Sequence, residues 1–155
     1  QVEGEKMASV ESGLHARVLQ ARPDCTASVH THQPIASAYT LLDRPLRINN
    51  LELQKWLGNM LPCVAYAPSG TEELARLVAG AFDAGNHACL MRNHGVVCVG
   101  RDMDEARKRL AALEAACAEW FTGRLDEAPA LPRASEKLLR ETFSAAMFLP
   151  GQGGR

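Results

Sequence analysis

The stretch Cys25-Thr-Ala-Ser-Val-His-Thr-His32 decides the fold of this chain and points to its chemistry. Its small and β-branched residues predict a short strand over residues 25–31. Side chains two residues apart on a strand point to the same face, so His30 and His32 are expected to lie side by side. They can bind one metal ion together, or each can be an ordinary half-buried polar residue. The pair does not decide between these alternatives on its own.

A third histidine, His94, lies in Met91-Arg-Asn-His-Gly-Val-Val97, where Asn-His-Gly interrupts two apolar runs. The runs at 88–91 and 96–99 predict a β-hairpin with His94 in its turn, because asparagine and glycine tolerate left-handed backbone conformations. Three neutral imidazoles around an open position form a common site for a catalytic divalent metal. We therefore hypothesise a site for Zn²⁺ or another divalent cation. Its candidate ligands are His30, His32 and His94.

The remaining apolar patterns predict helices alternating with short extended pieces. The expected helices cover residues 11–21, 34–42, 51–61, 69–82, 102–121 and 135–147. Ser69 and Glu72 have the spacing of a capping box at the start of the fourth helix. Residues 62–67 are expected to be extended, and residues 125–133 are expected to form a linker.

Composition excludes several classes of partner. The chain has 155 residues, 46% of them hydrophobic and 23% charged, and a formal net charge of −1. Without a basic block it offers no electrostatic attraction for nucleic acid or an anionic membrane. No apolar stretch approaches the length of a membrane span. The five cysteines form no C-x-x-C pair, which favours buried reduced thiols in a cytoplasmic protein over a disulfide scaffold.

Five segments, taken together, resemble the class II aldolase/adducin family, the zinc-dependent sugar-phosphate aldolases such as fuculose-phosphate aldolase. Residues 7–15, Ala21-Arg-Pro-Asp24 and Val29-His-Thr-His32 are similar to the family's S-S-E…RPD…VHTH block. Val64-Ala-Tyr-Ala-Pro-Ser-Gly-Thr-Glu-Glu-Leu74 resembles its PYAPPGTEEL segment. Leu90-Met-Arg-Asn-His-Gly-Val-Val-Cys-Val-Gly100 resembles its LLRNHGVVAVG hairpin. The resemblance implies an α/β fold with a mainly antiparallel central sheet flanked by helices.

The resemblance also implies a domain organisation. Residues 1–124 are expected to form a class II aldolase/adducin-type domain that lacks its N-terminal part. Residues 125–148 are expected to form a linker and a C-terminal helix, and residues 149–155 a disordered tail. Aldolases of the family assemble as rings, so a homo-oligomer is expected, with a tetramer favoured and the C-terminal helix at the interface.

The function implied is that of a metal-dependent lyase, which cleaves or forms a C–C bond in a small hydroxy-ketone or sugar phosphate. Dehydratase, epimerase and decarboxylase activities share the same metal cradle within the family and remain alternatives. A non-catalytic, adducin-like interaction domain is the alternative from another class. The complete set of three histidines favours the enzyme, because an interaction domain does not require them.

Two further residues acquire roles by resemblance. Glu11 lies where the family has its catalytic glutamate and is expected to act as acid and base; alternatively, it is an acidic residue favoured by the dipole at a helix start. Ser9 is expected to bind substrate, or else to cap the helix. Val10 replaces a family hydroxyl that helps to bind phosphate. His15 is expected to lie in a helix close to the site, and His87 in a surface loop.

The segment Arg47-Ile-Asn-Asn-Leu51 departs from two branches of the family. It lacks the tyrosine of the fuculose-phosphate aldolase branch, and it lacks the acidic residue of the epimerase branch. Neither substrate specificity therefore transfers directly to this chain.

Overall fold

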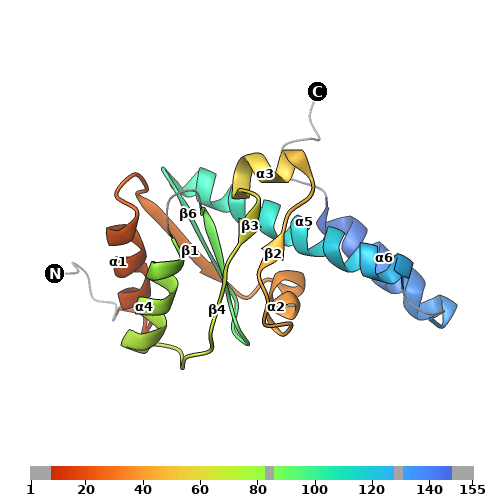
Figure 1. Cartoon of the computed structure of the whole chain (residues 1–155), viewed down its shortest axis with the longest axis horizontal. Helices are drawn as coiled ribbons and strands as arrows, with labels where there is room; N and C mark the ends of the chain where they lie inside the picture. The colour runs from red at the N-terminus through yellow and green to blue at the C-terminus, as the bar shows by residue number, and fades with distance from the viewer. Residues whose placement is uncertain (1–7, 83–85, 128–130, 148–155) are drawn as a thin grey trace.

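A computed structural model describes residues 8–82, 86–127 and 131–147 (Figure 1). The described part of the chain contains six helices and six short strands. The helices are α1 (Ser12–Ala21), α2 (Pro34–Thr40), α3 (Leu51–Leu57), α4 (Glu72–Ala81), α5 (Met103–Glu127) and α6 (Arg133–Ala146). The strands are β1 (Ala27–Thr31), β2 (Leu46–Arg47), β3 (Met60–Leu61), β4 (Cys63–Val64), β5 (Ala88–Met91) and β6 (Val96–Gly100).

The central sheet has the strand order β1-β6-β5-β4. Strand β1 runs antiparallel to β6, with His30 opposite Val97, and β5 also runs antiparallel to β6. Strand β4 is parallel to β5, and the short strands β2 and β3 form a separate antiparallel pair. The expectation of an α/β fold with a mainly antiparallel sheet is confirmed.

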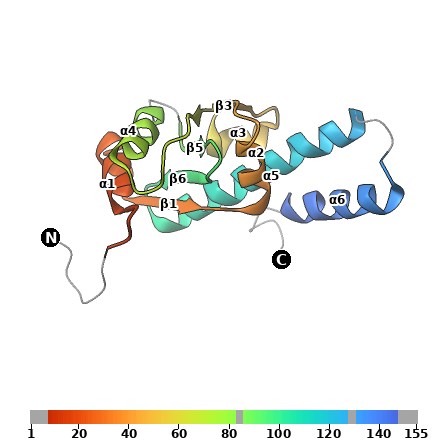
Figure 2. The same ribbon diagram turned by 90° about the horizontal axis from the view of Figure 1, so that it is seen from below.

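Helices cover both faces of this sheet (Figures 1 and 2). Strand β6 sends Val97 and Val99 into one apolar cluster, which it shares with α1 and α4. It sends Val96 and Cys98 into the other cluster, which it shares with α2, α3 and α5. This alternation is the two-residue repeat of a strand buried on both faces. Since His30 lies opposite Val97, the two histidines of the β1 segment belong to the face covered by α1 and α4.

The fourth helix begins later than the capping box predicts. Its N-cap is Thr71, whose hydroxyl accepts a hydrogen bond from Leu74 N at 3.2 Å. Threonine at this position satisfies one of the free amides of the first turn. Ser69 is therefore free to make a different contact, described below.

Two other boundaries also differ from expectation. Helix α3 ends at Leu57, because Gly58 adopts φ 84°, and the chain then forms β3, a strand that the helical pattern of residues 51–61 concealed. Helix α5 continues past Phe121 to Glu127. Phe121 and Leu125 pack against the core that includes Phe143 of α6, so tertiary contacts extend the helix.

The C-terminal part of α5 projects beyond the sheet, and α6 returns alongside it (Figure 2). None of the helices in the described ranges is long and apolar enough to cross a membrane. The expected tail at residues 149–155 lies outside the described residues.

Candidate metal centre

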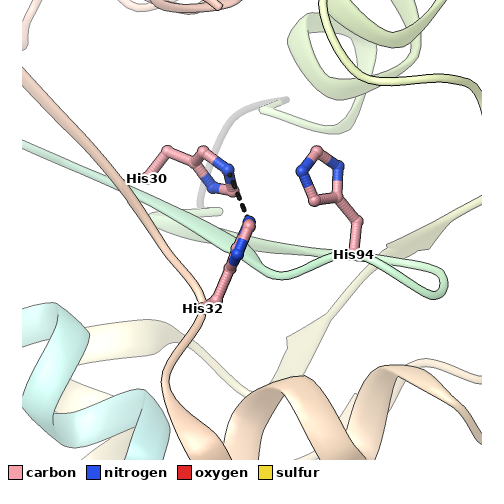
Figure 3. A group of neighbouring side chains, drawn as sticks. All are labelled: His30, His32 and His94. Atoms are coloured by element: carbon pink, nitrogen blue, oxygen red, sulfur yellow. Dashed lines mark hydrogen bonds between the residues drawn. The ribbon is translucent and has the colours of Figure 1, made fainter.

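The three candidate ligands come together at one end of the sheet (Figure 3). His30 lies in β1, His32 lies one residue beyond it, and His94 lies in the turn between β5 and β6. Their ring centroids are 4.9 to 5.0 Å apart. One nitrogen from each ring lies within 4.8 Å of the others. The strand spacing and the hairpin therefore produce the convergence expected from the sequence.

The tight turn after β5 allows this approach. Asn93 has φ 57°, a left-handed conformation that asparagine tolerates better than most residues. Gly95 is needed for space, because a Cβ there would lie 2.5 Å from His32 Cδ2 and 2.5 Å from the Thr31 carbonyl oxygen. The Asn-His-Gly sequence thus sets both the path of the turn and the contact between the turn and the end of β1.

The tautomer of His30 follows from its hydrogen bond. Nδ1 of His30 lies 2.9 Å from the carbonyl oxygen of Val96, which can only accept, so Nδ1 carries the hydrogen. In the neutral ring, Nε2 then offers its lone pair, and it lies 3.2 Å from His32 Nε2. A metal-binding histidine typically donates its other ring N–H to a carbonyl in this way.

Glu11, the residue before α1, places its carboxylate among the same rings. Its Oε2 lies 2.9 Å from His30 Nε2, and its Oε1 lies 3.3 Å from His94 Nε2. The Ser69 hydroxyl donates a 2.5 Å hydrogen bond to Glu11 Oε1. Burial alone would raise the pKa of Glu11, but the Ser69 hydrogen bond and the nearby histidines outweigh it and hold the pKa below its usual value. Glu11 is therefore ionised at neutral pH.

Sequence reasoning missed Ser69 as part of this site. The Ser69-x-x-Glu72 spacing predicts a helix cap, and no sequence signal links Ser69 to Glu11. Only the packing of α1 on α4 brings the two residues together.

The other histidines differ in their relation to the site. Burial and the nearby His30 lower the pKa of His15. The Nδ1 atom of His15 lies 2.9 Å from Ser28 Oγ, and Ser28 lies on the same face of β1 as His30. His87 is half-buried, with its Nδ1 3.3 Å from Arg22 Nη2. Val99 N donates to the His87 carbonyl, so His87 lies at the end of the hairpin away from the His94 turn.

Ser9 is exposed and lies beside Glu11. Its hydroxyl accepts a 3.3 Å hydrogen bond from Glu11 N, and its carbonyl accepts from Ser12 N at 3.0 Å. These bonds belong to the turn that precedes α1, whose N-cap is Glu11 and whose first turn receives no side-chain capping bond. Val10, the neighbouring residue, is 78% exposed.

The donor set fits a divalent cation. Burial lowers the pKa of His94, which favours the neutral imidazole that a metal requires. His30 offers the lone pair of Nε2, and Glu11 offers a carboxylate. Two hydrogen-bond acceptors that face each other repel unless a proton or a cation lies between them. Histidine nitrogens and one carboxylate are ligands that zinc commonly accepts.

Comparison with known proteins agrees with this geometry. The sequence model of the class II aldolase and adducin N-terminal domain family matches residues 1–121 of this chain. The 5-methylthioribulose-1-phosphate/5-deoxyribulose-1-phosphate aldolase of Rhodospirillum rubrum is 32% identical over 141 residues, which cover 90% of this chain and 63% of that protein. The L-fuculose phosphate aldolase of an Escherichia coli O6:H1 strain is 34% identical over 101 residues, covering 65% of this chain and 46% of that protein.

Solved structures give the same result. An L-fuculose-1-phosphate aldolase from Thermus thermophilus superposes with a TM-score of 0.71 at 34% identity, covering 83% of this chain and 70% of that chain. Another L-fuculose 1-phosphate aldolase gives a TM-score of 0.77 at 28% identity, covering 92% of this chain and 67% of that chain. This chain spans between 46% and 63% of the length of the two curated relatives above. The match over residues 1–121 shows that the chain belongs to the class II aldolase and adducin family.

Proposed function

We propose that this chain provides the metal centre of a lyase of the class II aldolase type, acting on a sugar phosphate or a small hydroxy-ketone. The observation that carries the proposal is the convergence of three imidazoles and one ionised carboxylate. We assign His30, His32 and His94 as metal ligands, with zinc the expected metal. The presence of all three histidines favours an enzyme over an interaction domain, because an interaction domain does not require metal ligands.

The chemistry divides between the metal and Glu11. When bound, a divalent cation supplies Lewis-acid polarisation of the substrate carbonyl. Glu11 removes a proton from the carbon next to that carbonyl in the direction of synthesis, and returns it in the direction of cleavage. Ser69 and the nearby histidines keep Glu11 ionised for the first task, and the Ser69 hydrogen bond fixes the orientation of its carboxylate.

The substrate is expected to be phosphorylated, because the similar aldolases are named for 1-phosphate and other phosphate esters of sugars. Ser9, which is exposed next to Glu11, is the proposed substrate-binding hydroxyl. Val10 presents an apolar side chain at the next position. We therefore expect this site to bind phosphate with fewer hydroxyl donors than the family pattern provides.

The protein is further proposed to work as a homo-oligomer, most simply a tetramer. Helix α6 projects with α5 away from the sheet (Figure 2). Its Leu138 is 65% exposed. We expect this projection to contact another subunit, with Leu138 in the contact, and closed symmetry is the usual outcome for soluble oligomers. The five unpaired cysteines agree with a reducing, cytoplasmic location.

A cleavage assay tests the proposed function. Aldol cleavage of L-fuculose 1-phosphate or 5-deoxyribulose 1-phosphate releases dihydroxyacetone phosphate, which an NADH-linked reductase detects. We expect release from at least one of these ketose phosphates, loss of release after treatment with a chelator, and recovery with added zinc. The test variant is His30→Ala. Its matched control is His87→Ala, because His87 lies away from the site. Cleavage that persists in His30→Ala would contradict the proposal, as would isomerised substrate without cleavage.

A further inference from the structure

We propose that Glu114 of α5 is a positioning residue for His32, acting through the backbone at the start of α2. This inference rests on the proposed metal centre, in which His32 is a ligand. Glu114 itself touches none of the three rings. It fixes the chain immediately after β1, and so determines where the His32 ring lies.

The contacts of Glu114 are specific. Its Oε1 accepts a 2.9 Å hydrogen bond from Ile35 N, and its Oε2 accepts a 2.8 Å hydrogen bond from Ala36 N. These amides belong to the first turn of α2, where no helical carbonyl is available to them. A carboxylate is favoured there by charge-assisted hydrogen bonds and by the helix dipole.

Helix α2 has no local substitute for this cap. Gln33 occupies the N-cap position, but its side chain makes no capping hydrogen bond, and Pro34 has no N–H to offer. Ile35 and Ala36 are buried, with 6% and 0% of their surface exposed, so water cannot readily replace Glu114. A buried amide left without an acceptor is costly. The start of α2 therefore depends on a side chain from α5.

His32 is the ligand most sensitive to that backbone. Pairing of β1 with β6 ends at Thr31, opposite Val96, so His32 lies just outside the ladder. His30, by contrast, is held in the ladder and by its bond to the Val96 carbonyl. The His32 ring is exposed, and its hydrogen bond in the described structure is to His30, another ligand. Its position is consequently set between the end of β1 and the Glu114-bound start of α2.

The decisive variant is Glu114→Gln, which keeps the shape but leaves one acceptor oxygen for two amides. The matched control is Asn50→Ala, because the Asn50 side chain accepts from Glu52 N and Leu53 N at the start of α3. Both variants remove part of a helix cap, and both should lower the Tm. Only Glu114→Gln should weaken zinc binding, by about 10- to 100-fold, the usual effect of losing a residue that orients a ligand.

Zinc affinity is measured by competition with a chromophoric chelator, and imidazole NMR resonances are recorded on the metal-free protein. Glu114→Gln should shift the His32 resonances and leave those of His94 in place, while Asn50→Ala should change neither. The inference is overturned if Glu114→Gln binds zinc as the parent does, or if Asn50→Ala weakens binding equally. Should the parent bind no zinc, the proposed metal centre fails, and an unshifted His32 resonance in Glu114→Gln separately refutes the positioning role.

Discussion

Oε2 of Glu11 lies 2.9 Å from Nε2 of His30, so the start of α1 meets the C-terminal end of β1. The contact depends on α1 packing against the same face of the sheet that carries the histidines. Because the His30 Nδ1 hydrogen is directed at the Val96 carbonyl, Nε2 faces Glu11, and in the neutral ring it does so with its lone pair. A lone pair and a carboxylate so close together require a shared proton or cation.

Glu11→Gln should retain the fold and bound metal but reduce turnover by about 100-fold or more, the effect of losing general acid and base catalysis. Glutamine keeps the side-chain length and can still accept from Ser69, so the neighbouring residues need not move. Steady-state cleavage rates and zinc content of parent and variant provide the measurement. Full activity in Glu11→Gln would remove Glu11 from the proposed chemistry.

Gly95→Ala should lower both zinc affinity and stability. The new methyl group would lie 2.5 Å from His32 Cδ2 and 2.5 Å from the Thr31 oxygen, so the end of β1 must move away. Overpacking of this kind typically costs about 1–3 kcal/mol. Gly123→Ala is the control, because its Cβ meets nothing within 4 Å and lies in α5, where alanine is favoured over glycine. Equal zinc titrations for the two variants would show that Gly95 does not position the ligands.

Asp24→Asn should lower stability at neutral pH and have little effect in strong acid. Two hydrogen bonds from the Arg22 guanidinium, at 2.8 and 2.7 Å, hold the pKa of Asp24 well below its usual value of about 3.9. A folded-state pKa below the unfolded one stabilises the fold above about pH 4, and this contribution is lost as the pH falls toward the folded-state pKa.

Urea denaturation of parent and variant at pH 7 and at pH 2.5 tests the Asp24 prediction. We expect the difference between the two denaturation midpoints to shrink at the lower pH. A difference that stays constant with pH would mean that the Arg22–Asp24 pair does not carry the effect.

Light scattering at micromolar protein concentration should give a mass several times 16.8 kDa, and most simply four times that value. Leu138→Glu should lower the mass, because it places a charge on an exposed apolar position of α6 without entering the core. Circular dichroism identifies any unfolding of the variant. A monomer of 16.8 kDa for the parent, unchanged by added zinc, would refute the oligomer for this chain.

The sequence predicted those features that depend on local repeats. The two-residue spacing of His30 and His32 predicts that both side chains lie on one face of the strand. The Asn-His-Gly interruption predicts the turn that carries His94. The mainly antiparallel sheet followed from the family resemblance, and it was confirmed.

Features that depend on distant packing were not predictable in this way. The spacing of Ser69 and Glu72 predicts a helix cap, yet Ser69 donates to Glu11 because α1 and α4 pack together. The spacing of apolar residues predicts a helix through Asn59 and Met60. In the structure Gly58 ends that helix, and the following residues form β3, which pairs with β2. Glu114 lies within a long amphipathic helix, and nothing local to it indicates that it caps α2.

Zinc content tests the central claim most directly. Purified protein would be loaded with zinc, dialysed against metal-free buffer and analysed by inductively coupled plasma mass spectrometry, beside the double variant His30→Ala, His32→Ala. Three ligands on one chain predict about one zinc per chain in the parent and almost none in the double variant. Equal zinc content in the two proteins, or none in the correctly folded parent, would contradict the assignment of His30, His32 and His94 as a metal centre.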